Sequence, residues 1–290
     1  MRRLRPILVV ALVACATIGV SAAVAHVRGA GETGAAGGDG MPALRLAGVN
    51  FVTTCGFSHR NQDDLIVFPG QPGASHDHTY FGATTTHVGS TLDSLRAGGT
   101  TCHRPGDTAA YWVPTLFRDG VAVEPLGATI YYRRRTVDPV RAFPEGLRMI
   151  AGDARATSPQ ARRVTFWNCG VAADVPPASE PPDCPPGRRS GLRLHVTFPN
   201  CWDGRSLDSS DHQSHMAYSQ RGVCPASHPV EVPSISLIVR YGIAEADGLE
   251  LASGGVYSAH ADFVNAWDQA TLRRLVARCL NALRHCGRGL

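Results

Sequence analysis

Residues 111–125 read "YWVPTLFRDGVAVEP", two apolar runs joined by Asp119-Gly120. An Asp-Gly pair between such runs is a strong signal for a tight β-hairpin, because both residues accept the positive φ angles of its turn. Five further short runs, rich in β-branched and aromatic residues, lie at 127–134, 147–152, 163–169, 191–199 and 234–242. No long helices alternate with them, which disfavours a parallel βαβ sheet. We expect a mainly β (α+β) fold, an antiparallel β-sandwich or jelly-roll-like core with long loops.

One segment near the C-terminus has a helical pattern instead. Residues 260–283, "HADFVNAWDQATLRRLVARCLNAL", repeat apolar side chains with a period near 3.6, and Asp262 falls in the expected first turn. The apolar positions are Phe263, Val264, Trp267, Leu272, Leu275, Val276 and Leu280. This pattern predicts a C-terminal helix that closes the sandwich.

The first 40 residues are typical of an export segment and a tether. A basic start precedes an apolar run at 6–25 that ends in Ala-Val-Ala, which predicts a signal peptide over residues 1–25. The run is also long enough for an N-terminal membrane anchor, and Leu12–Cys15 resembles a lipoprotein cleavage box. Each alternative exports the chain. Residues 26–40 are rich in Gly and Ala and predict a flexible tether, followed by a single domain at 41–290.

The charge balance argues against one class of partner. Three of the 28 basic residues lie in the export segment, which leaves 25 arginines against 24 acidic residues. The one basic run, at 133–135, is short. A nucleic-acid partner is therefore not expected.

The cysteines predict disulfide bonds. Without Cys15, eight cysteines remain in the exported chain, and none has the CxxC spacing of a zinc site. Pairing of sequence neighbours is the simplest of many connectivities: 55–102, 169–184, 201–224 and 279–286. Seven residues of continuous helix span about 10 Å, too far for a disulfide. A 279–286 bond therefore requires the helix to break between the two cysteines, near 284–287.

The histidines fall into three clusters with carboxylates. The first is His76-Asp77-His78 with Asp64 nearby, the second lies in "DSSDHQSHMAYS", residues 208–219, and the third is His260-Ala261-Asp262. In an extended segment, side chains two residues apart share a face, so His76 and His78 are able to chelate one metal ion. Candidates for acid/base catalysis are Asp64, His76, His78, Asp211, His212 and His215. Candidates for metal ligands are His76, His78, His215 and His260, a set that suits zinc, manganese or copper.

Structural roles for these residues remain open. A Ser-His-x-His stretch between Gly and Pro residues also suits a turn whose imidazoles bond to the backbone, and Asp262 also suits a helix N-terminus. The spacing Gly70-x5-His76-x-His78 matches the opening of the cupin metal motif, but the glutamate expected after it is missing. No Gly-x-Ser-x-Gly, phosphate loop or HExxH occurs. Trp202 suits sugar stacking or packing against a disulfide.

Five ordered motifs carry a family resemblance. They are "DDLIVFPGQPGASHDHTYFG", "YWVPTLFRDG", "FPNCWDGRSLDSSDHQSHMAYS", "CPASHPVEVPSISLIVRYG" and "SAHADFVNAW". Together they resemble the DUF1996 family of secreted proteins from actinobacteria and fungi, over about residues 50–286. The resemblance implies no settled activity. Members often carry sugar-binding modules, which points to extracellular polysaccharide.

We therefore expect an exported, disulfide-bonded protein that acts on extracellular or cell-wall polysaccharide through a His/Asp acid/base or metal site. One alternative is a non-catalytic domain that binds carbohydrate or the cell envelope, and another is a copper- or zinc-binding protein. A membrane partner is expected only if the N-terminal segment is uncleaved or lipidated.

Overall fold

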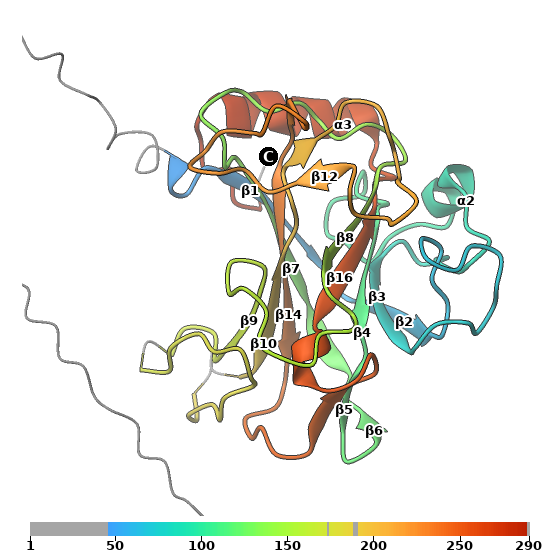
Figure 1. Cartoon of the computed structure of the whole chain (residues 1–290), viewed down its shortest axis with the longest axis vertical. Coiled ribbons are helices and arrows are strands. Elements are labelled where there is room, and N and C mark those ends of the chain that lie inside the picture. Colours follow the sequence, from blue (N-terminus) through green and yellow to red (C-terminus); the bar gives the residue numbers. More distant parts are fainter. Residues whose placement is uncertain (1–45, 173, 188–190, 289–290) are drawn as a thin grey trace, which may run out of the picture. The chain divides into compact units, whose positions relative to one another are not determined.

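The computed structural model describes residues 46–172, 174–187 and 191–288. The expected signal peptide and tether, residues 1–40, lie outside these ranges, as does the expected start of the domain at residue 41. Most of the regular structure in the described residues is β (Figure 1). The expected mainly β, antiparallel fold is confirmed.

Two five-stranded sheets form the body of the fold, and all pairings within them are antiparallel. The first sheet has the strand order β1 (Asn50–Cys55), β7 (Pro125–Arg133), β14 (Ser234–Tyr241), β10 (Arg193–Thr197) and β9 (Thr165–Asn168). The second has the order β2 (Phe57–Asn61), β3 (His78–Gly82), β4 (Ala110–Pro114), β16 (His260–Val264) and β8 (Arg148–Gly152). All five runs expected as strands outside the hairpin are strands here.

The main core lies where the two sheets face each other. Alternate residues of each strand point inward, as on any pleated strand. From the second sheet Phe81, Tyr111 and Phe263 enter this core, and from the first Ile130 and Leu237. The opposite face of the second sheet, here called its outer face, carries a smaller apolar cluster. Its members include Tyr80, Trp112, Val264, Ala110, Leu65 and Ile66, all buried. Both faces of the second sheet are therefore covered.

The hairpin expected from Asp119-Gly120 is confirmed. It joins β5 (Leu116–Arg118) to β6 (Val121–Ala122), and Asp119 and Gly120 have φ values of 50° and 77°. With β15 (Leu249–Leu251) it makes a three-stranded sheet, and β11 (Cys201–Trp202), β12 (Met216–Ala217) and β13 (Val230–Glu231) make another. A short helix, α2 (Leu92–Ala97), and a 3-10 turn, η1 (Val256–Ser258), complete the connections.

The C-terminal helix is shorter than the sequence pattern indicated. Residues 260–264 form strand β16, and the helix α3 (Gln269–Leu275) begins only after them and continues as the π-helical turns of η2 (Val276–Asn281). Asp268, whose side chain accepts a hydrogen bond from the Thr271 amide, caps α3. The expectation that Asp262 serves the helix N-terminus is therefore wrong. A segment of five residues is too short for its pattern to separate a strand from a helix, and pairing with β4 and β8 makes this one a strand.

Disulfides tie the periphery together as predicted from sequence neighbours. The pairs are Cys55–Cys102, Cys169–Cys184, Cys201–Cys224 and Cys279–Cys286. The last pair forms because the helix ends at Asn281 and Leu283 adopts a φ of 54°, slightly before the expected break. Four disulfides in a chain of this size are typical of exported proteins. Over the ranges that the structure describes, no helix combines the length and apolar character that crossing a membrane requires.

Candidate functional site

The second sheet places two of the candidate histidines on its outer face. Side chains two residues apart on a strand point to the same face, so His78 shares the outer face with Tyr80 on β3, and His260 shares it with Asp262 on β16. Tyr80 pairs with Trp112 of β4, and Trp112 pairs with Asp262. Strand β4 lies between the two histidine strands, so their backbones are about 10 Å apart. The imidazoles of His78 and His260 extend toward each other over β4, so their rings lie closer together than their backbones do.

The loop from β2 to β3 delivers the other members of the site. Its Asp77 turns away from the site: the carboxylate accepts the Thr115 hydroxyl proton and pairs with Arg60 at 3.1 Å. The flanking side chains, His76 and His78, consequently point the other way. Earlier in the loop, one carboxylate oxygen of Asp64 accepts the Ile66 and Val67 amides at 2.8 and 2.9 Å. These contacts fix the loop over the sheet.

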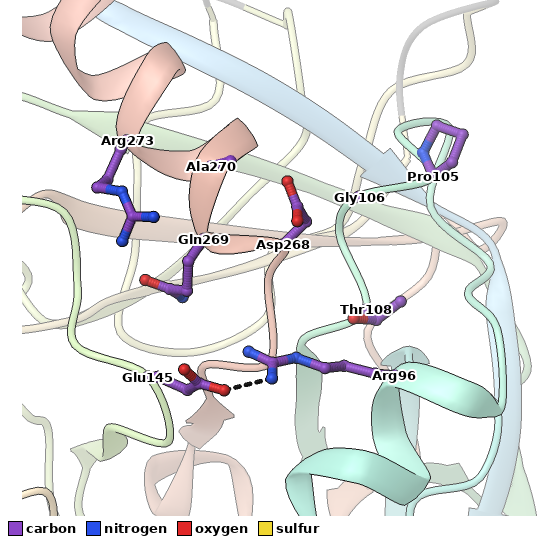
Figure 2. A pocket seen from close by; sticks show the side chains of 9 residues that line it. All are labelled: Arg96, Pro105, Gly106, Thr108, Glu145, Asp268, Gln269, Ala270 and Arg273. Carbon is purple, nitrogen blue, oxygen red and sulfur yellow. Dashed lines mark ion pairs between the residues drawn. The ribbon is translucent and has the colours of Figure 1, made fainter.

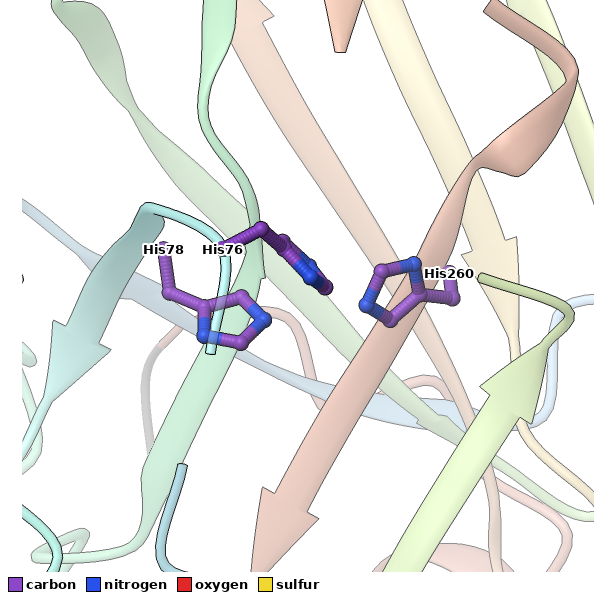
Figure 3. A group of neighbouring side chains, drawn as sticks. All are labelled: His76, His78 and His260. Atoms are coloured by element: carbon purple, nitrogen blue, oxygen red, sulfur yellow. The ribbon is translucent and has the colours of Figure 1, made fainter. Parts of the chain in front are cut away.

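Three imidazoles meet at this point (Figure 3). The ring centroids of His76 and His78 are 4.2 Å apart, those of His76 and His260 are 5.1 Å apart, and those of His78 and His260 are 5.9 Å apart. One nitrogen from each lies within 4.8 Å of the other two. His78 and His260 are buried, and His76 is half-buried. This group of three is called the histidine centre below.

Hydrogen bonds assign the tautomers of the two buried imidazoles. Nδ1 of His78 is 3.0 Å from the Asp63 carbonyl oxygen, and Nδ1 of His260 is 2.8 Å from the Ser258 carbonyl oxygen. A carbonyl only accepts, so both Nδ1 atoms carry the proton, and both Nε2 atoms keep a lone pair. Nε2 of His76 and Nε2 of His78 are buried and have no hydrogen-bond partner within the described residues. Unpaired buried acceptors are rare in folded proteins.

Two carboxylates lie beside the histidine centre. Oxygens of Asp64 and Asp262 and a nitrogen of His78 lie within 4.8 Å of one another, and Oδ2 of Asp262 is 3.8 Å from Nε2 of His260. Asp262 is 1% exposed and Asp64 is 4% exposed. In the part of the chain that is described, Oδ2 of Asp262 also has no hydrogen-bond partner. Two groups of three potential ligands therefore lie side by side and share His78.

The protonation of these groups follows from burial. Burial lowers the pKa of His78 well below its usual value, and the neighbouring His76 and His260 lower it further. Burial lowers the pKa of His260 to about 4 and also lowers the pKa of His76. Burial, followed by the charge of Asp64, raises the pKa of Asp262 well above the ordinary range. At neutral pH the imidazoles are neutral, which is the form that binds metal ions.

The site opens into a pocket of about 760 Å³. His76, His260, Asp64 and Asp262 form part of its wall. Most of the other lining side chains are polar: Ser75, Asp153, Arg155, Ser210, Asp211, His212, Gln213 and Ser253. Polar residues thus outnumber apolar ones along the wall, so the pocket offers hydrogen-bonding groups to a polar ligand.

The second histidine cluster contributes to the pocket through His212. His212 has a φ of 59°, and its Nδ1 is 3.0 Å from a carboxylate oxygen of Asp208. Arg148 holds Asp208 from the other side at 3.5 Å. Asp211 also lines the pocket, but one of its oxygens accepts the Gln213 and Ser214 amides and the Ser209 hydroxyl. These bonds, that of Ser214 first, hold the pKa of Asp211 well below its usual range.

His215 stands apart from the histidine centre. Its Nδ1 is 2.9 Å from the Ser209 hydroxyl, and its Nε2 is 2.7 Å from the Arg148 carbonyl oxygen. With both nitrogens engaged, His215 has no lone pair aimed at the pocket. The structure thus brings together His76, His78, His260 and Asp64, adds His212 and Asp211 on the pocket wall, and leaves His215 in a structural position.

Two residues of the site were not candidates from the sequence. Asp262 was assigned to a helix, and reading 260–264 as a strand places it on the same face as His260. Asp208 pairs with His212 at i,i+4 across an irregular turn, a contact that no periodic pattern indicates.

Comparison with known proteins yields one match. The model of a protein family described as "Domain of unknown function (DUF1996)" matches residues 64–267. This match includes all the residues of the pocket wall. Neither the curated proteins nor the solved structures contain a match.

Proposed function

The chain belongs to the DUF1996 family, whose description assigns no activity, and from the site geometry we propose that it is an exported metalloenzyme acting on extracellular or cell-wall polysaccharide. The metal ion is held by His76, His78 and His260, and Asp262 and Asp64 complete or adjust its coordination. The pocket beside this centre receives the glycan.

One observation carries the metal assignment: one ring nitrogen each of His76, His78 and His260 lies within 4.8 Å of the others, and Nε2 of His76 and Nε2 of His78 are buried without a hydrogen-bond partner among the described residues. A buried acceptor without a partner costs about 1–3 kcal/mol, and two or more in contact are expected only where a ligand satisfies them. The Nδ1–H bonds of His78 and His260 to backbone carbonyls are the outer contacts that orient metal-binding imidazoles in proteins.

The dimensions and charges also fit an ion. Two nitrogens that share zinc at about 2.1 Å each are at most about 4.2 Å apart. The candidate atoms lie within 4.8 Å, so a small closure of the side chains is sufficient. Burial raises the pKa of Asp262 and of Asp64, and a divalent cation beside them would favour their ionised, metal-binding form. Three imidazoles with carboxylates suit zinc, manganese or copper.

A metal ion in such a site supplies a Lewis acid and an activated water molecule. His212 lies on the pocket wall with Nδ1 on Asp208, so its Nε2 is oriented to exchange a proton with a bound glycan. Arg155 and Asp153 flank the same pocket and offer hydrogen bonds to hydroxyl groups. The polar wall supports a carbohydrate over an apolar ligand.

Turnover of glycans tests this proposal. Wild-type protein, loaded with zinc, manganese or copper, is incubated with a panel of bacterial and fungal cell-wall polysaccharides, and new reducing ends or unsaturated products are measured. We expect product formation that a chelator stops and that His76→Ala abolishes. His228→Ala serves as the control, because both nitrogens of His228 are bonded away from the pocket, to Ser227 and Ser214.

A different outcome would favour a second function. His78 and His260 are 0% and 3% exposed, which also suits an enclosed ion with a non-catalytic role. Stoichiometric metal without any product from the whole panel would contradict the enzyme and indicate a metal-binding protein. Saturable glycan binding without metal or product would indicate a carbohydrate-binding domain.

A further inference from the structure

A basic face runs along the C-terminal helical segment. From Asp268 to Arg288 the chain has five arginines and one acidic residue. The arginines are Arg273, Arg274, Arg278, Arg284 and Arg288, all exposed. Four large apolar side chains of the same segment, Leu272, Leu275, Val276 and Leu280, are buried in the core, whereas Leu283, after the helical turns end, is exposed. The segment therefore turns its apolar side inward and its cations to solvent.

Three surface clefts border this segment, and arginines line each of them. The first, of about 530 Å³, lies between Arg96 and Arg273 (Figure 2). The second, of about 580 Å³, is lined by Arg273 and Arg141. The third is smaller and is lined by Arg274, Arg278 and Arg104. Cationic side chains beside grooves are the arrangement that tracks a linear polyanion.

Little acidic charge offsets these arginines. Glu145 pairs with Arg96, as Figure 2 shows, and Asp268 caps α3. Among the described residues, no ion pair engages Arg141, Arg273 or Arg278. Arginine forks bind carboxylates and phosphates in two-point contacts, so unpaired arginines in a row favour a ligand that repeats such groups.

We propose that this arginine face binds an anionic polysaccharide, a linear glycan that carries carboxylate or phosphate groups. The binding is independent of the histidine centre, since the residues that line the three clefts do not line the pocket there. The face retains the protein on a charged extracellular polymer, whatever the pocket acts on.

Two other anionic partners fit less well. A helix that binds a membrane surface exposes a stripe of large apolar side chains, whereas α3 and η2 expose Ala270 and Ala277 between their charges and bury their leucines. Leu283, beyond the end of η2, is exposed but does not extend such a stripe. Single-stranded nucleic acids are held by aromatic side chains that stack on bases. Among the described residues, the one aromatic side chain that lines these clefts is that of Phe143, which is 1% exposed.

The test is binding of polygalacturonate, which carries carboxylates, and of a glycerol-phosphate polymer, with dextran as the neutral reference. We expect the wild type to bind at least one of the two charged polymers, with an affinity that falls steeply with salt, and not to bind dextran. The triple variant Arg273→Ser, Arg274→Ser and Arg278→Ser loses about tenfold or more in affinity. Which polymer binds identifies the charged group.

Two further variants make the result decisive. The matched triple variant Arg135→Ser, Arg162→Ser and Arg205→Ser removes the same charge from exposed positions elsewhere and keeps wild-type affinity. The triple Arg→Lys variant at 273, 274 and 278 retains much of the affinity and shows that charge at this place matters. Equal losses in the two serine triples, no binding of either charged polymer, or tighter binding to duplex DNA or to anionic vesicles would overturn the proposal.

Discussion

The histidines of this protein differ in how many of their ring nitrogens form hydrogen bonds. His59, His103, His215 and His228 use both ring nitrogens in hydrogen bonds to hydroxyls or the backbone. His78 and His260 use Nδ1 alone in hydrogen bonds, and each has a nitrogen within 4.8 Å of a nitrogen of His76. This difference separates a histidine with a structural role from a candidate metal ligand, and it depends on neighbours that are distant in sequence.

This division predicts opposite effects for two substitutions. His215→Ala leaves the Arg148 carbonyl and the Ser209 hydroxyl without their buried partner, so we expect a loss of about 1–3 kcal/mol in the free energy of unfolding. His76→Ala removes a half-buried side chain whose Nε2 is unpaired, so we expect less than about 1 kcal/mol in metal-free protein. Urea unfolding in the presence of a chelator measures both. A larger loss for His76→Ala than for His215→Ala would contradict the assignment.

The buried residue Asp107 makes the stability of the core depend on pH. Asp107 lies in a buried network with the hydroxyls of Tyr111 and Tyr132, and burial raises the pKa of its carboxyl to about 7. The unfolded value is about 3.9, so the stability that depends on its protonation is complete below pH 4 and is lost as the pH rises through 7.

Asp107→Asn removes this pH dependence, because the amide keeps a neutral acceptor for Tyr111. We expect the variant to match the wild type near pH 4 and to exceed its stability by up to about 4 kcal/mol at pH 8. Unfolding curves of both proteins across this range give the difference. Parallel pH profiles would show that Asp107 does not titrate in the folded protein.

At the scale of elements, the centre depends on how closely β8 and β16 approach. Gly152 ends β8 opposite His260 with a φ of 90°, and a Cβ there would lie 2.5 Å from the Ala259 carbonyl oxygen. Gly152→Ala must therefore shift the backbone that carries His260. We expect a loss of more than about 1 kcal/mol in stability and weaker metal binding.

Gly254→Ala is the matched control, since Gly254 has a φ of 110° but no atom within 4 Å of the added Cβ. We expect Gly254→Ala to lose stability through backbone strain alone and to bind metal with the wild-type affinity. Metal titrations of the two variants by calorimetry separate the effects. Equal metal affinity in both would show that the close approach of β8 does not position His260.

Local signals explain which elements were predictable. The Asp119-Gly120 hairpin and the β-branched runs are determined by residues adjacent in sequence, and both form as expected. Strand β16 was not predictable in the same way, because "HADFV" fits a helix or a strand until β4 and β8 are placed beside it. The helix begins after it because Asp268 supplies the cap that Asp262 was expected to supply.

In the described part of the chain as a whole, acidic and basic side chains gather in different places. Four aspartates gather at the pocket of the histidine centre, and arginines gather along α3, η2 and the clefts beside them. Composition alone conceals this, because 25 arginines nearly balance 24 acidic residues after the export segment. Likewise, the three histidine clusters were visible in the sequence. Their convergence was not, since strand order decides that β3 and β16 flank β4.

Metal content of protein purified without a histidine tag tests the central claim most directly. After exposure to zinc, manganese and copper in turn and removal of free ions, elemental analysis should find about one tightly bound ion per wild-type chain for at least one of them. His78→Ala and His260→Ala should contain almost none, and His215→Ala should keep the wild-type amount. Absence of stoichiometric metal from the wild type, or the same content in all four proteins, would contradict the proposed centre.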